Sequence, residues 1–331
     1  MNPKTSVTDM ATLLVAGNSI PVRTQSLSQT TLVIGLQNVV DYMDDIADPL
    51  QFAKNSNPTP AGGVIDFGVA TPLGDIVTVN GQPAKGLYAS RARGIRTSLT
   101  LQPGNAIADV TRTAMRELYF EILTSSGTPV GTIFGLGLSG GSPPPGAPSG
   151  GHGNWAIVGG TGAFLGAIGQ ICGTGAAGRA ASMAEDPSRR RINGGTSFSF
   201  NIYVIPMFQP QIATISSGPA VMHADHTPVS SHKPAAPGET LSLLATGLGP
   251  TVPEVDLGLP FPSSPAANVN SPVTVTVNGE AAQVLNAVGY PGSVGAYQVD
   301  FQVPSNAAKG TAALQLTAAW IPATPVTITV H

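Results

Sequence analysis

Hydrophobic and polar residues alternate with a period of two along much of this chain, which is the pattern of β-strands with one buried face. Residues 115–123 show the alternation most clearly. One face of this segment carries Arg116, Leu118, Phe120 and Ile122, and the other carries Met115, Glu117, Tyr119, Glu121 and Leu123. Because the first face is mostly apolar, we expect it to meet a hydrophobic core.

Similar strand patterns recur between residues 60 and 207, with turn signals between them. The expected strands cover residues 76–79, 86–90, 95–101, 114–123, 130–138, 154–158 and 196–205. Asn80-Gly81 follows the first of them and is the strongest short hairpin signal. Residues 139–153 are rich in Gly, Pro and Ser, so we expect a loop there that contributes no packing. The pattern predicts a β domain over residues 60–207.

Residues 1–59 form an N-terminal extension in this interpretation, and it is partly irregular. Residues 31–36 have the composition of a strand, whereas residues 38–52 are acidic and predict a short helix. This second segment contains Asp41, Asp44, Asp45 and Asp48. Their spacing matches no calcium-binding loop, so we expect them on a solvated helix face.

A second β domain is predicted over residues 238–331, after a linker loop at 208–237 that is rich in Pro, Ser and His. The expected strands are 240–245, 273–277, 282–288, 296–303, 313–318 and 324–330. Asn278-Gly279 supplies another hairpin turn. Short strands at regular spacing are typical of a β-sandwich.

The composition agrees with an all-β protein and excludes some functions. Gly and Pro number 40 and 30 of 331 residues, and helices tolerate neither residue well. Charged residues make up only 10% of the chain, and the net charge is −3. Apart from Arg189-Arg190-Arg191 there is no basic run, so we expect no nucleic-acid partner, which would require many phosphate contacts. The triplet fits a solvated loop.

Other sequence features indicate what the chain lacks. Cys172 is the single cysteine, so the chain forms no internal disulfide. It lies in an apolar, strand-like run and fits core packing better than nucleophilic catalysis. No run of 18 apolar residues occurs, so we expect no membrane span. The N-terminus shows no signal peptide pattern.

The segment Gly160-x-Gly162 followed by Gly166 imitates a dinucleotide-binding motif. That motif requires a following helix and repeated βαβ units, and the surrounding pattern predicts neither. Glycine also accepts a positive φ without steric cost. We therefore interpret this segment as a turn between two strands and expect no nucleotide cofactor.

A cluster of His223, Asp225, His226 and His232 has the residue types of a zinc site. It lies in the Pro-flanked linker and has no cysteine, so the pattern favours a solvated loop. We expect no metal site and no cofactor. No Gly-x-Ser-x-Gly motif occurs, which leaves a serine hydrolase without support.

The sequence around the glycine segment resembles that of a known family. Trp155-Ala156-Ile157-Val158 followed by Gly159-Gly160-Thr161-Gly162-Ala163-Phe164 is similar to the signature of dirigent proteins and the related allene oxide cyclase barrels. Gly86-Leu87-Tyr88 and Gly131-Thr132-Ile133 match the same family in order. The resemblance covers roughly residues 60–207. It implies an eight-stranded antiparallel barrel that steers or cyclises small molecules without a cofactor, with Gly159, Gly160, Thr161, Gly162 and Phe164 as its barrel signature. Leu165 and Ile168 stand where that family usually has basic residues.

The C-terminal part resembles a domain that is common in secreted proteins of soil acidobacteria. The matching segments are Pro237-Gly238-Glu239, residues 245–250, Val275-x-Val277-Asn278-Gly279 and residues 295–304. The resemblance implies an Ig-like β-sandwich. It also implies an extracellular or cell-surface location.

These observations lead to one main functional hypothesis and two alternatives. The main hypothesis is an extracytoplasmic barrel that binds or steers a small apolar molecule, with the Ig-like domain providing attachment or spacing. The candidate ligand-binding residues are Tyr88, Arg96, Glu117, Tyr119 and Tyr203. The resemblance to dirigent-type barrels also implies self-association through the barrel.

The first alternative is a structural or adhesive surface protein whose barrel is filled by its own side chains. The second is a cofactor-free cyclase or isomerase with Glu117 or Glu121 as the base. A packed interior would favour the structural protein. A carboxyl group with a raised pKa inside the barrel would favour the enzyme.

Overall fold

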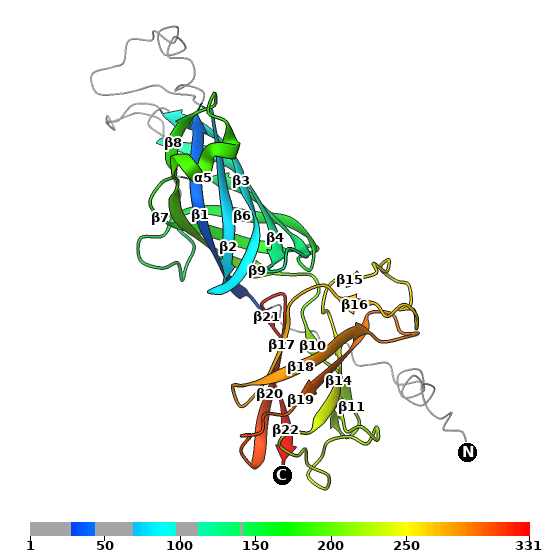
Figure 1. Cartoon of the computed structure of the whole chain (residues 1–331). Coiled ribbons are helices and arrows are strands. Elements are labelled where there is room, and N and C mark those ends of the chain that lie inside the picture. The colour runs from blue at the N-terminus through cyan, green and yellow to red at the C-terminus, as the bar shows by residue number, and fades with distance from the viewer. Residues whose placement is uncertain (1–27, 44–68, 97–111, 140–141) are drawn as a thin grey trace, which may run out of the picture. The chain divides into compact units, whose positions relative to one another are not determined.

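The computed structural model describes residues 28–43, 69–96, 112–139 and 142–331 of the chain, with the side chains of 94–96 and 112–113 left out (Figure 1). The described part contains two compact units, one formed by Gln29–Met207 and one that includes Phe208–His331. Both units are built from β-strands, so the predicted all-β class is confirmed. No helix in these ranges is long and apolar enough to cross a membrane.

The first unit is a closed antiparallel barrel of eight strands, as predicted. Its strands are β1 (Thr30–Met43), β2 (Val69–Val79), β3 (Gln82–Arg96), β4 (Arg112–Thr124), β5 (Pro129–Leu138), β6 (His152–Gly162), β7 (Ile168–Gly175) and β9 (Thr196–Ile205). Each strand pairs with the next, and β9 returns to pair with β1. Between β7 and β9 the chain forms β8 (Arg179–Ser182), η1 (Pro187–Arg189) and α5 (Arg190–Asn193). Strand β8 pairs in parallel with the end of β1.

The barrel interior is filled at mid-height by large side chains. The predicted inner face of β4 is confirmed, because Leu118, Phe120 and Ile122 are fully buried. The rings of Tyr88, Phe120 and Phe200 contact one another with centroids 4.9–5.4 Å apart. Fully burying a side chain of this size contributes about 1.5–3 kcal/mol, so this aromatic layer is a main source of the barrel's stability.

The glycine signature, residues 159–164, lies at the end of the barrel where β6 finishes, opposite the end where β4 begins. Gly162 has a φ of +61° and leads into a turn, after which the chain continues as β7 rather than as a helix. Phe164 in this turn is fully buried. A Cβ atom at Gly160 would lie 2.4 Å from the carbonyl oxygen of Phe164. The glycine therefore allows the close approach that seats Phe164, and our interpretation of the segment as a turn is confirmed.

The barrel begins earlier than the predicted boundary at residue 60, and this corrects our assignment of residues 1–59 to an extension. Strand β1 contributes Leu32, Ile34 and Leu36 to the core. It continues to Met43 across a bulge between Gln37 and Val40, where a helix was predicted. The bulge shifts the alternation of buried positions by one residue, which hides the strand pattern. Residues 44–52 of the predicted helix lie outside the described residues.

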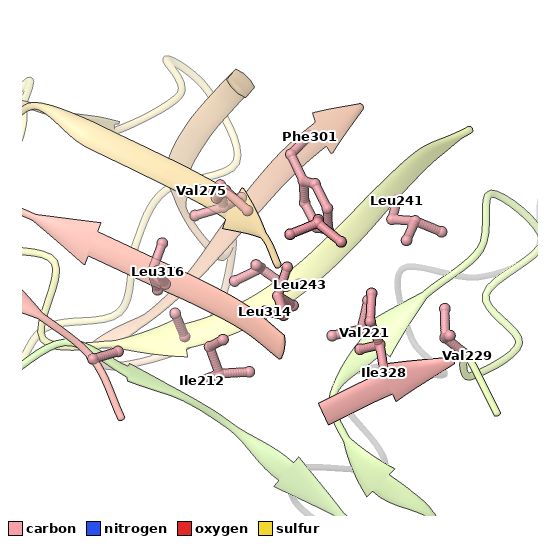
Figure 2. Close-up of a cluster of buried hydrophobic side chains, with 14 of the residues drawn as sticks. Ile212, Val221, Val229, Leu241, Leu243, Val275, Phe301, Leu314, Leu316 and Ile328 are labelled. Carbon is pink, nitrogen blue, oxygen red and sulfur yellow. The ribbon is translucent and has the colours of Figure 1, made fainter. Parts of the chain in front are cut away.

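The second unit is a curled open sheet of eleven strands with an additional two-stranded ribbon. Its strands are β10 (Gln211–Ile212), β11 (Thr214–Ile215), β12 (Gly218–Pro219), β13 (Val221–Met222), β14 (Thr240–Thr246), β15 (Thr251–Val252), β16 (Asn268–Val269), β17 (Val273–Val277), β18 (Glu280–Gly289), β19 (Ala296–Gln302), β20 (Gly310–Ala318), β21 (Ile321–Pro322) and β22 (Val326–Val330). Strand β18 pairs with β17 through its first residues and with β19 through the rest. The sheet thereby curls around one core (Figure 2).

Residues 208–237 are part of this second unit, which corrects their assignment as a linker loop. Strands β10 and β13 both pair with β14. Figure 2 shows Ile212, Val221 and Val229 in the same cluster as Leu243 and Leu314. Strands of two residues are too short to show a period, so the abundant Pro and Ser masked the buried positions between them.

Candidate functional site

The inner face of the barrel changes from apolar to polar toward the end where β1 finishes and β4 begins. Arg116 on β4 follows the alternation of its buried neighbours and faces inward. It lies opposite Gly137 of β5, which in turn lies opposite Trp155 of β6. Because Gly137 has no side chain, nothing from β5 separates Arg116 from Trp155 at this level.

Asp41 on β1 faces the same end of the interior. Its neighbours Val40 and Tyr42 face outward and pack with Ala181 of β8. Burial raises the pKa of the Asp41 carboxyl, and the positive charge of Arg116 lowers it in part. A Cβ atom at Gly178 would lie 2.5 Å from Asp41 Oδ1. The backbone of the segment that follows β7 therefore lies directly against this carboxylate.

Tyr88 and Ser90 of β3 complete the group, which we name the inner polar cluster: Asp41, Tyr88, Ser90 and Arg116. Tyr88 is only 2% exposed. Burial raises its pKa to about 12, against the opposing effects of Arg116 and Ser90, and the charge of Asp41 adds to the increase. The phenol thus responds electrostatically to the other three members, and the four groups form one electrostatic unit.

Three buried donor groups at this end have unmet hydrogen-bonding capacity. Trp155 Nε1 and Arg116 Nε have no hydrogen-bond partner within the described residues, and Ser90 Oγ has none at normal hydrogen-bond geometry, although hydrogen bonding to the Ser90 and Arg116 side chains acts to lower the pKa of Tyr88. More than about 90% of buried polar groups in native proteins have a partner, and leaving one without costs about 1–3 kcal/mol. Three such atoms together indicate a place where a polar group of a ligand can bind.

Of the predicted ligand-binding residues, only Tyr88 belongs to this cluster. Glu117 and Tyr119 lie on the outside of the barrel, where Tyr119 is 40% exposed and its hydroxyl donates to Glu117 Oε2 over 2.7 Å. Any ligand that they contact would lie on the outer surface. Arg96 is the last residue of β3, opposite Arg112, and its side chain lies outside the described residues.

Tyr203 occupies a third position, outside the barrel wall and under a loop. It is buried, and its hydroxyl donates to the carbonyl oxygen of Gly146 over 3.1 Å. The neighbouring Cys172 is buried as well, and a Cβ atom at Gly151 would lie 3.8 Å from its Sγ. The loop over residues 142–151 therefore packs on β7 and β9, which corrects the expectation that it contributes no packing.

The sequence prediction missed Asp41, Ser90 and Arg116. One signal was available for Arg116, because it is a charged residue on the otherwise apolar face of a strand whose direction was predicted correctly. For Asp41 there was none, because it was placed on a solvated helix. Ser90 is an ordinary small residue within a strand, and only the closed barrel shows that it is buried.

An ionic network on the outer wall holds the segment between β7 and β9 in place, with α5 lying against β1 (Figure 1). Asp75 of β2 forms ion pairs with Arg190 and Arg191 and accepts a hydrogen bond from Asn38. Arg190 Nε also donates to the backbone oxygen of Asn38 over 2.9 Å. Burial would raise the pKa of Asp75, but the hydrogen bonds and the arginine charges outweigh it and lower the pKa. Arg190 and Arg191 of the arginine triplet thus take part in the structure of the barrel wall, which corrects the expectation that the triplet is a solvated loop.

The histidine segment of the second unit is also engaged in local structure. His223 is buried, with Nδ1 2.5 Å from Glu239 Oε1 and Nε2 3.1 Å from the carbonyl oxygen of Lys233. Lys233 forms an ion pair with Asp225. Within the described ranges, no three His, Cys, Asp or Glu side chains are grouped so that they could hold a metal ion.

Comparison with known proteins provides no further guide to the site. No family model matches this chain, and neither a curated protein nor a solved structure matches it.

Proposed function

We propose that the barrel binds a small, mainly apolar molecule whose polar group contacts the inner polar cluster. The observation that carries this proposal is the grouping of Ser90 Oγ, Arg116 Nε and Trp155 Nε1, three buried donor atoms whose hydrogen-bonding capacity the described residues do not fill with normal geometry. They lie at one end of a barrel whose remaining interior is apolar. An eight-stranded barrel is just wide enough to hold one small ligand.

The chemistry of the cluster suits a ligand with a carbonyl, hydroxyl or carboxyl group. Arg116, Trp155 and Ser90 all provide donors, and Asp41 faces them across the barrel. The resemblance to dirigent and allene oxide cyclase barrels supports a steering role, in which a rigid wall fixes the conformation of the apolar part. No cofactor is needed for that role.

The cofactor-free cyclase or isomerase is the second candidate, and Asp41 favours it. A carboxyl group whose pKa is raised by burial is suited to proton transfer near neutral pH. Asp41 takes the role that the sequence suggested for Glu117 or Glu121, since Glu117 and Glu121 lie on the outer face of β4. The filled aromatic layer favours the third candidate, a structural barrel that binds nothing.

Native mass spectrometry of the intact protein, purified gently from its own host, separates these candidates. We expect a small molecule of constant mass to co-purify with the wild-type protein and to be lost from Arg116→Met. The matched control is Arg91→Met, because Arg91 lies on the outer face of β3, opposite Glu117, and should keep the adduct. If all three proteins show only the mass of the polypeptide, even after soaking in host extract, the third candidate, a structural barrel that binds nothing, would be supported.

The co-purified compound can also be used as a substrate to test for catalysis. If the barrel is a cyclase or isomerase, wild-type protein should convert the co-purified compound into an isomer of equal mass that chromatography resolves. Asp41→Asn should keep the compound bound and unconverted. Equal conversion by the two proteins would exclude Asp41 as the base.

We propose that the second unit is an Ig-like accessory domain that attaches or spaces the barrel outside the cytoplasm. The support is its resemblance to the domain of secreted acidobacterial proteins, together with a curled sheet around a large hydrophobic core. Protease treatment of intact host cells tests the location. Digestion of the protein without lysis is the expected result, and full protection would contradict it.

Self-association through the barrel is proposed from its outer apolar surface. This surface consists of Met115, Tyr119, Leu136, Leu138 and Val158, all exposed. It covers adjacent strands, since Met115 lies opposite Leu138, and β5 carries no charged residue. Light scattering should show an oligomer that Leu136→Glu dissociates, whereas a wild-type monomer at high concentration would refute the proposal.

A further inference from the structure

A shallow groove of about 410 Å³ lies across the outside of the barrel wall. It is lined by Gly35, Leu36, Gln37, Val77, Thr78, Thr174, Gly175, Ser197, Phe198 and Ser199. These residues come from β1, β2, β7 and β9, which are adjacent strands of the closed barrel. A site on four hydrogen-bonded strands is held more rigidly than a site on loops.

The strand register places hydroxyl groups in a row along this groove. Thr78 lies opposite Gly35, Gly35 lies opposite Ser199, and Ser199 lies opposite Thr174. Neighbouring strands are about 4.8 Å apart, so the row offers hydrogen-bonding groups at regular intervals. Thr78 Oγ1 lies 2.3 Å from the position that a Cβ atom would take on Gly35. The groove therefore depends on glycine at its centre, because a side chain there would displace the Thr78 hydroxyl.

The lining decides which ligand chemistry fits. None of its ten residues is charged. The ion pairs of Asp75 with Arg190 and Arg191 leave one net positive charge in the neighbouring ionic network, outside the lining of the groove. A hydroxyl group both donates and accepts hydrogen bonds, and the Gln37 amide adds a further donor and acceptor. The ring of Phe198 faces the barrel interior, where its centroid lies 4.9 Å from that of Phe200, so it adds no aromatic surface to the groove.

We propose that this groove binds a neutral, polyhydroxylated ligand of the linear oligosaccharide class. Hydroxyl and amide groups with no net charge match the alternating donors and acceptors of sugar hydroxyls, and an anionic glycan would find no cation in the lining. The groove lies on the outside of the wall, whereas the inner polar cluster lies inside the barrel. The proposal therefore does not depend on the proposed function of the interior.

Saturation-transfer difference NMR on the full chain tests this proposal with cellohexaose, maltohexaose and xylohexaose as probes and a heparin hexasaccharide as the charged comparison. We expect one or more neutral probes to bind and the heparin fragment not to bind. The triple variant Thr78→Val, Thr174→Val, Ser199→Ala should weaken binding by about tenfold or more through lost hydrogen bonds. The control Thr31→Val changes an exposed threonine of β1 outside the groove and should bind as the wild-type protein does.

A second groove variant distinguishes a loss of ligand contacts from a loss of the fold. Gln37→Ala with Ser197→Ala removes two exposed side chains of the lining, so the fold should be unaffected while binding weakens. Binding of heparin but not of the neutral probes would overturn the proposal. So would the absence of binding by every probe, or neutral binding that both groove variants leave unchanged.

Discussion

Arg190 and Asp75 form an ion pair between residues 115 positions apart in the sequence, and this pair fastens the segment between β7 and β9 to the barrel. Both side chains are largely buried, with 12% and 16% exposure. The fastened segment also includes Gly178, whose backbone lies against Asp41. The ion pair on the outer wall thus belongs to the same segment that contacts a carboxylate inside the barrel.

Asp75→Ala should destabilise the barrel by about 3 kcal/mol, because it leaves two arginines without their carboxylate. The pKa of Asp75 is lowered in the folded protein, so its contribution is present above its unfolded pKa of about 3.9 and is lost as pH falls through the folded-state pKa. Urea denaturation at several pH values, monitored by hydrogen exchange in β1, measures the loss of stability and its dependence on pH. Glu121→Ala, an exposed carboxylate on β4, is the control. An equal and small loss in both variants would contradict a role for this network.

Asp41→Asn should stabilise the protein at pH 7. Burial raises the pKa of Asp41, so the folded state binds the proton more tightly, and stability falls as pH rises from the unfolded pKa through the folded-state pKa. Asparagine imitates the neutral carboxyl and avoids that loss. The gain should disappear below about pH 3.9, where both states are protonated.

Thermal melting at pH 7 and pH 3.5 measures this prediction, with about 2–4 °C expected per kcal/mol for a unit of this size. Asp75→Asn is the internal contrast, because its effect at pH 7 should have the opposite sign. A lower melting temperature for Asp41→Asn at pH 7 would mean that attraction to Arg116 outweighs burial.

Gly160→Ala should destabilise the barrel by about 1–3 kcal/mol, the usual cost of overpacking. The new Cβ atom would lie 2.4 Å from the carbonyl oxygen of Phe164 and 2.7 Å from that of Thr132, and neither backbone group can move freely. Denaturant titration measures the loss. Val158→Ala, an exposed position on the same strand, should change stability by less than about 0.5 kcal/mol. A neutral Gly160→Ala would show that this turn can relax.

Regular alternation was enough to predict several strands of the barrel wall, but it revealed neither β7 nor the place of β1 in the barrel. Residues 196–205 form a strand with the bounds that the pattern gave. Asn80 and Gly81 adopt positive φ angles of 51° and 75°, as a two-residue hairpin requires. Both features are local, so the sequence shows them without knowledge of the fold.

The candidate site was predicted poorly because it depends on contacts that are distant in the sequence. The bulge at Asn38, whose φ is +53°, breaks the period of β1 and conceals that Asp41 faces inward. Whether Ser90 and Trp155 have partners can be judged only once the strands close. Tyr203 was expected to contact a ligand, but it faces a loop whose Gly- and Pro-rich sequence gave no sign of packing.

Tyr203→Phe should expose Cys172 to solvent reagents. The Tyr203 hydroxyl binds Gly146 in the loop over residues 142–151, and this loop covers Cys172 on β7. Burial raises the pKa of the Cys172 thiol, against a smaller lowering by its hydrogen bond with Tyr203, and the raised pKa adds to its low reactivity because the thiolate is the nucleophile. Cys172 is the single cysteine of the chain, so a thiol reagent such as Ellman's reagent reports on this position alone.

Loss of one hydrogen bond of about 1 kcal/mol should increase the labelling rate about fivefold if labelling follows loop opening. Tyr119→Phe, which removes an exposed hydroxyl on the outer face of β4, away from β7 and β9, should leave the rate unchanged. Equal rates in wild-type protein and Tyr203→Phe would show that the bond to Gly146 does not hold the loop closed.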